Sequence, residues 1–147
     1  KSKGKSLFSL LIDIYLEYGL YKEKLINIVR KGADGANEIK AMMKGYRNHP
    51  PKKINNSKVI RINDYETLVS TDCITGEKTR INLIKSDVLQ FFLEDGSKIS
   101  VRPSGTEPKI KFYFSVNTGL ESAAAYDDTM KLLDERIEGI INDMKLK

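Results

Sequence analysis

The chain has 147 residues, which is enough for one domain and a short additional segment, and 40% of them are hydrophobic. No apolar run approaches the ~20 residues that cross a bilayer, so we expect no membrane partner. Cys73 is the only cysteine, which excludes an intrachain disulfide and suits a reducing, cytoplasmic location. Because His49 is the only histidine, the composition offers no ligand set for zinc. The net charge of +5 favours an anionic partner.

The first segment combines a helix and a strand. Residues 6–19 have the apolar spacing of a helix, with Ser6 placed to cap its start and Gly19 its end. The apolar face consists of Leu7, Leu10, Leu11, Ile14 and Tyr18. Residues 25–29 follow as a strand, and Lys31-Gly32-Ala33 then breaks the pattern. We place a domain boundary here, so that residues 1–32 and residues 33–147 form separate units.

A second helix is predicted over residues 35–47. Asp34 is a suitable N-cap, and Pro50 and Pro51 end the helical pattern. The apolar face consists of Ile39, Met42, Met43 and Tyr46. Such a face packs against the rest of the domain.

The middle of the chain reads as short strands separated by turns. The predicted strands are 59–62, 81–83, 88–93, 98–102 and 109–116. A hairpin tip is expected at Thr75-Gly76-Glu77, and Asp95-Gly96 predicts a type I′ hairpin turn.

The last segment, residues 120–146, reads as a long helix. Its apolar stripe consists of Tyr126, Met130, Leu133, Ile137, Ile140, Ile141 and Met144. This stripe and the helix at 35–47 both need a sheet face to cover. The pattern therefore predicts an α+β fold with an antiparallel sheet of about four strands and helices on one face.

The loop between the last two predicted strands carries the chemistry. Arg102 offers a planar fork of donors that suits phosphate, and Ser104 and Thr106 offer hydroxyl donors. Gly105 permits unusual backbone angles and close approach of an anion to main-chain N–H groups. Lys111 shares the strand face of Arg102 because it alternates with apolar residues. On residue types alone, a phosphate pocket and an ordinary polar hairpin turn both remain open.

The run from Val101 to Tyr113, VRPSGTEPKIKFY, resembles the phosphate-binding loop in the C-terminal domain of the α-D-phosphohexomutases, the phosphoglucomutase and phosphomannomutase family. The resemblance extends over essentially the whole chain. It implies that residues 1–32 are the helix-strand remnant of a preceding α/β domain, the family's third. Residues 33–147 would then be the fourth, C-terminal domain.

The resemblance also implies a function. These enzymes, an isomerase class, transfer a phosphoryl group between O1 and O6 of a hexose phosphate, using a phosphoserine, Mg²⁺ and a sugar-binding loop in their other domains. In this chain Arg102 would pair with the phosphate that is not transferred, and Lys111 would supply a second cation. Ser104 and Thr106 would donate hydroxyl hydrogen bonds, and Gly105 a main-chain N–H. We therefore expect a hexose phosphate and the remaining enzyme domains as partners, no cofactor or catalytic residue in this chain, and no turnover by the chain alone.

Simpler roles and other functions stay open. Lys111 could be an ordinary exposed strand residue, Thr106 could bond only within its own loop, and Tyr113 is expected to pack rather than contact a ligand. The net charge would also suit a nucleic-acid-binding module, although no basic stripe with interleaved aromatics supports nucleic acid as a partner. The apolar helix in residues 6–30 would suit a structural module that forms a dimer through this segment.

Overall fold

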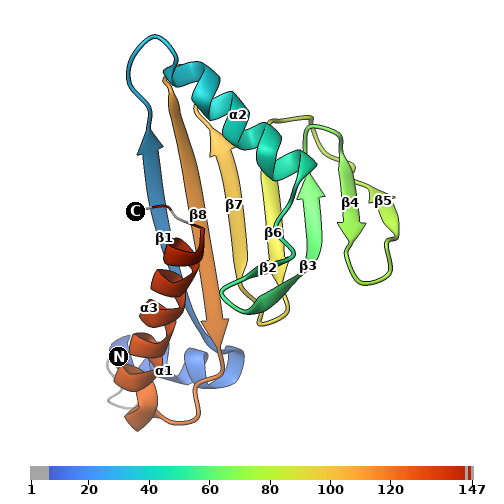
Figure 1. Ribbon diagram of the computed structural model, residues 1–147. Coiled ribbons are helices and arrows are strands. Elements are labelled where there is room, and N and C mark those ends of the chain that lie inside the picture. Colours follow the sequence, from blue (N-terminus) through green and yellow to red (C-terminus); the bar gives the residue numbers. More distant parts are fainter. Residues whose placement is uncertain (1–6, 145, 147) are drawn as a thin grey trace.

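The computed structural model describes residues 7–144 and 146. Its helices and strands, shown in Figure 1, are α1 (Leu7–Tyr18), β1 (Leu20–Val29), α2 (Gly35–Asn48), β2 (Lys53–Ile54), β3 (Ser57–Asp64), β4 (Val69–Asp72), β5 (Lys78–Arg80), β6 (Leu89–Leu93), β7 (Lys98–Pro103), β8 (Lys109–Thr118), the 3₁₀ turn η1 (Ala123–Ala125) and α3 (Tyr126–Asp143). None of these helices is long and apolar enough to span a membrane.

The strands form one antiparallel sheet in the order β1-β8-β7-β6-β3-β4-β5, with β2 paired to β3 beside this path. The α+β class is confirmed, but the sheet has eight strands, more than the sequence predicted. β1 extends one edge, and the hairpin of β4 and β5 extends the other. All three residues of β5 are exposed, so this strand has no apolar alternation for a sequence pattern to detect.

The core lies between one sheet face and two helices. Alternate side chains of the three central strands, β6, β7 and β8, are fully or almost fully buried. They are Leu89, Phe91, Leu93, Ile99, Val101, Ile110, Phe112, Phe114 and Val116. Both α2 and α3 cover this face, and none of the helices in the described residues covers the opposite face (Figure 1). The predicted apolar stripe of the last helix is confirmed, since Leu133, Ile137, Ile140 and Ile141 are buried.

The helix ends differ in part from the predictions. Gly19 ends α1 as expected, with a φ of +94° and an N–H that donates to the Tyr15 carbonyl at 2.8 Å. Ser6 lies outside the described residues. Asp34 is the N-cap residue of α2, as predicted, but its side chain makes no capping hydrogen bond. α3 begins at Tyr126 rather than residue 120, because Ala123–Ala125 forms a tighter 3₁₀ turn before it.

Both predicted hairpins are present, with different details. Only Gly96 has a positive φ at the Asp95-Gly96 turn, and its N–H donates to the Leu93 carbonyl at 3.0 Å. The turn is therefore type I followed by a left-handed glycine, not type I′. The carboxylate of Asp95 accepts a hydrogen bond from the Ser97 N–H, which suits this form. At the other tip, the returning strand is Lys78–Arg80 rather than residues 81–83.

The first segment joins the main sheet. β1 pairs with β8 over ten successive residue pairs, from Leu20 opposite Thr118 to Val29 opposite Lys109. We expected this strand to belong to a preceding α/β domain, but in the structure it is the edge strand of the same sheet. The division of the chain at residue 32 stays a prediction.

The apolar face predicted for α1 is exposed. Leu7 is 75% exposed and Tyr18 67%, with Leu10, Leu11 and Ile14 between them also exposed. The helix instead docks through Ile12, which is buried, and through the rings of Phe8 and Tyr15, which contact Tyr126. Apolar spacing therefore identified the helix correctly but not the face that it buries in this chain.

Candidate anion-binding site

The candidate site lies where β7 ends and β8 begins. Arg102 of β7 pairs directly with Lys111 of β8, and Lys111 pairs on its other side with Asn27 of β1. Directly opposed residues of antiparallel strands have Cβ atoms about 4.5–5.5 Å apart. Because Val101 and Phe112 point into the core, their neighbours Arg102 and Lys111 point to the helix-free face.

The two cations have no protein partner within the described part of the chain. Neither Arg102 nor Lys111 makes an ion pair or a side-chain hydrogen bond there. Lys109, by contrast, forms an ion pair with Glu107, with Nζ 3.4 Å from Oε1. Two adjacent like charges without a counter-charge create a positive potential, so this corner of the sheet is suited to an anion.

The loop between the strands is closed by its own hydrogen bonds. The Ser104 N–H donates to the Lys109 carbonyl at 2.8 Å, and the Lys109 N–H donates to the Glu107 carbonyl at 2.7 Å. The Thr106 N–H donates to Ser104 Oγ at 3.4 Å. The hydroxyl of Ser104 therefore accepts one hydrogen bond and keeps its proton for another acceptor, such as a ligand oxygen.

Neither the backbone angle nor the packing of the protein requires a glycine at position 105. Its φ lies outside the left-handed region, contrary to the expectation of an unusual conformation. A Cβ added at Gly105 would meet nothing within 4 Å. The glycine thus leaves its surroundings open, which would let an anion reach the main chain.

The loop is also anchored to the segment that precedes α2. The Arg30 N–H donates to the Pro108 carbonyl at 2.8 Å. A Cβ on Gly35, the first residue of α2, would lie 2.3 Å from the Arg30 carbonyl oxygen and 3.1 Å from Pro108 Cβ. Glycine is needed here because the two backbones approach closely. This contact fixes the C-terminal end of the loop.

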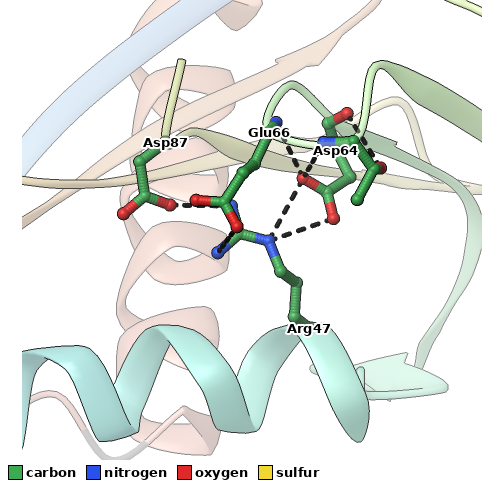
Figure 2. A network of polar contacts seen from close by, with 5 residues as sticks. Arg47, Asp64, Glu66 and Asp87 are labelled. Atoms are coloured by element: carbon green, nitrogen blue, oxygen red, sulfur yellow. Dashed lines mark hydrogen bonds and ion pairs between the residues drawn. The ribbon is translucent and has the colours of Figure 1, made fainter. Parts of the chain in front are cut away.

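An ionic network holds the other end of α2 to the same end of the sheet (Figure 2). Arg47 Nε lies 3.0 and 3.2 Å from the two carboxylate oxygens of Asp64, and another guanidinium nitrogen lies 2.7 Å from Asp87. Glu66 is more distant, at 3.8 Å. Asp64 also accepts hydrogen bonds from the main-chain N–H groups of Glu66 and Thr67, which order the turn after β3.

The network stabilises the protonated, positively charged form of the Arg47 side chain. Burial alone would lower the pKa of its guanidinium, but the hydrogen bonds to Asp87 and Asp64, and their negative charges, raise the pKa above its ordinary value. Sequence reasoning missed this network because the acidic residues lie 17 to 40 positions away from Arg47. Only the strand pairing brings them together.

Of the five predicted site residues, the structure brings Arg102 and Lys111 together as strand neighbours and carries Ser104, Gly105 and Thr106 in the connecting loop. Their contacts with a ligand stay predictions. Tyr113, expected to pack, is 41% exposed on the helix-free face. The described residues contain no cluster of side chains suited to a metal ion.

These features define an α+β domain with two adjacent cations, Arg102 and Lys111, on the strands that flank a loop at one end of an antiparallel sheet. Residues 25–132 match the family described as phosphoglucomutase/phosphomannomutase, C-terminal domain. The chain belongs to this family.

Similar proteins agree with this assignment. A phosphoglucomutase from Staphylococcus haemolyticus is 38% identical over 117 residues, which are 80% of this chain and 21% of that protein. A phosphoglucomutase from Staphylococcus saprophyticus is 38% identical over 104 residues, 71% of this chain and 19% of that protein. This chain therefore spans about a fifth of the length of these relatives.

Among solved structures, the open form of the exocytosis-sensitive phosphoprotein pp63/parafusin, a phosphoglucomutase from Paramecium, is similar. The superposition covers 93% of this chain and 23% of that chain, with 13% sequence identity and a TM-score of 0.44.

Proposed function

We propose that this chain binds the phosphate group of a hexose phosphate through the loop at 102–108 and Lys111, as the phosphate-clamping part of a phosphohexomutase. Arg102 pairs with the phosphate through its guanidinium fork, and Lys111 adds a second positive charge. Ser104 and Thr106 donate from their hydroxyls, and Gly105 donates from its main-chain N–H. Such a clamp holds the phosphate that is not transferred and thereby positions the one that is.

The observation that carries the proposal is the pairing of Arg102 with Lys111 on an uncovered sheet face, with no counter-charge among the described residues. Arg47, by contrast, has its charge matched by the carboxylate of Asp64. The open space around Gly105 supports the same reading.

We propose that this chain is one domain of a cytoplasmic phosphohexomutase. In that setting the Mg²⁺ and the phosphorylated nucleophile belong to other domains, which are the partners of this one. The preference for glucose, mannose or another hexose would depend on those domains.

The proposal is tested by titrating the chain with inorganic phosphate at low ionic strength. An exposed clamp in open solvent is screened by salt and loses motional entropy on binding, so we expect a roughly millimolar dissociation constant that weakens as salt is added. A chain that binds a short nucleic acid duplex tightly but does not bind phosphate would contradict the proposal and favour the nucleic-acid alternative.

The chain alone is expected to be inactive. It supplies a grip on phosphate but, on this proposal, neither the phosphoryl donor nor the metal that phosphoryl transfer requires. A coupled assay for conversion of glucose 1-phosphate to glucose 6-phosphate measures this. A turnover rate well above that of the Arg102→Ala variant would contradict the expectation.

Replacing Gly105 by alanine separates binding from folding. The added methyl group meets no protein atom, so the free energy of unfolding should change by less than about 0.5 kcal/mol. The same methyl group would occupy space needed by a bound phosphate, and we expect phosphate affinity to fall by about threefold to tenfold, the worth of one net hydrogen bond. Urea unfolding and a phosphate titration measure the two effects. Unchanged affinity would remove Gly105 from the site.

A further inference from the structure

The helix-free face of the sheet has a hollow beside the candidate phosphate site. Its volume is 310 Å³, and its lining includes Ser100 of β7, Tyr113 of β8 and Leu25 of β1. These three residues pair across the strands and form the row next to Asn27, Lys111 and Arg102. Two residues along a strand cover about 6.6–6.8 Å, so the row lies one side-chain step from the two cations.

The hollow has the size and charge of a site for a small neutral group. Small-molecule sites have volumes of about 300–1,000 Å³, and this hollow lies at the lower limit. The row of Ser100, Tyr113 and Leu25 carries no charge. On the far side of the hollow, Lys98 and Glu23 flank Ser115 and have opposite charges, so that side does not favour a second anion.

A chain of hydrogen bonds across the strands ends at this hollow. Asn63 Nδ2 donates to the Tyr65 hydroxyl at 3.4 Å, which donates to Gln90 Oε1 at 2.8 Å. Gln90 Nε2 then donates to Ser100 Oγ at 3.2 Å. Because the Ser100 oxygen already accepts, its own proton is free to be donated to a ligand. Hydrogen bonds in such a chain polarise one another, which strengthens the donor at its end.

Tyr113 adds an aromatic surface with a free polar end. Its side chain is 41% exposed, and its hydroxyl makes no hydrogen bond with another described residue. Leu25, directly opposite on β1, is 46% exposed. A tyrosine ring offers apolar area and a hydroxyl together, and this combination suits a ligand with both C–H and O–H groups.

We propose that this hollow is a subsite for the hydroxylated, uncharged body of the same phosphorylated ligand, with Ser100 and Tyr113 as its contacts. A pyranose ring joined by one ester oxygen to a phosphate at Arg102 and Lys111 extends over the adjacent row. Ser100 donates to a ring hydroxyl, and Tyr113 lies against the ring and bonds a second hydroxyl. The inference rests on the proposed phosphate site, because that site fixes where the ring begins.

The test compares two phosphate monoesters on the complete chain, glucose 6-phosphate and ethyl phosphate, followed by amide chemical shifts. Both carry the same charged group, but only the first has a hydroxylated ring. We expect glucose 6-phosphate to bind about threefold to tenfold more tightly, the worth of one or two net hydrogen bonds. Ser100→Ala and Tyr113→Phe should each remove about threefold of this preference and leave ethyl phosphate binding unchanged.

Thr79→Ala is the matched control, since Thr79 carries a hydroxyl on the exposed strand β5, away from the hollow. It should change neither affinity. Equal affinities for the two esters, or variants that weaken both equally, would overturn the subsite and leave the phosphate site intact. If neither ester bound to the chain, the proposed function would be overturned and this subsite with it.

Discussion

Replacing Arg102 by alanine is expected to weaken phosphate binding by this chain by about 10- to 100-fold, because hydrogen bonds to charged groups contribute about 1.5–3 kcal/mol. Arg102 is exposed and forms no ion pair or side-chain hydrogen bond with another described residue, so the folded state should lose less than about 0.5 kcal/mol. Arg102→Lys keeps the positive charge but loses the planar fork of donors. Its affinity for phosphate should therefore lie between that of the unchanged chain and that of Arg102→Ala. Amide shifts during a phosphate titration measure all three affinities.

The matched control is Arg80→Ala, which removes an exposed arginine from β5. If binding depended only on the overall positive charge of the chain, Arg80→Ala and Arg102→Ala would weaken it equally. We expect an effect from Arg102 alone. Equal effects would mean that phosphate associates with the chain through diffuse charge, and the loop would lose its assigned role.

The second large effect is expected in folding, at Arg47. Its side chain is only 16% exposed and that of its main partner Asp64 15%, so the pair is largely removed from water. Arg47→Met keeps most of the aliphatic stem but leaves the carboxylates of Asp64, Glu66 and Asp87 without their shared cation. Removing one partner of a fully buried pair costs about 3–5 kcal/mol, and for this partly exposed pair we expect about 2 kcal/mol.

Urea unfolding of Arg47→Met measures this loss, with Lys44→Met as the control. Lys44 lies on the same helix, α2, and is exposed, so its replacement should change the free energy of unfolding by less than about 0.5 kcal/mol. A double variant, Arg47→Met with Asp64→Asn, should regain part of the loss, because the unpaired negative charge is removed while a side-chain oxygen remains to accept the N–H groups of Glu66 and Thr67. If Arg47→Met were as stable as the unchanged chain, the network would make no measurable contribution to the free energy of unfolding.

The centre of the fold was predictable because buried and more exposed side chains alternate along its strands. β7 and β8 alternate strictly, so their faces could be assigned from sequence, and with them the common direction of Arg102 and Lys111. The sheet edges were not predictable. β4 and β5 are short, and β5 is exposed throughout. The apolar residues of β1 and α1 did not indicate which sheet or face they would join.

The candidate site divides in the same way. Arg102, Ser104, Gly105, Thr106 and Lys111 are close in sequence, so one motif contains them all. The Arg47 network and the chain of hydrogen bonds from Asn63 to Ser100 depend on the register between strands far apart in sequence. Alternation along one strand gives the face of a residue, but it does not give the neighbour on the next strand, which only the folded sheet determines.

The central claim is that phosphate binds at the loop between β7 and β8. The most direct measurement is a residue-by-residue map of amide chemical shifts during titration of the complete chain with inorganic phosphate, repeated with equal ionic strength of chloride. We expect saturable, phosphate-dependent shifts at residues 102–111, and none of comparable size on β4, β5 or α3. Shifts that are absent from residues 102–111 while present elsewhere would contradict the claim.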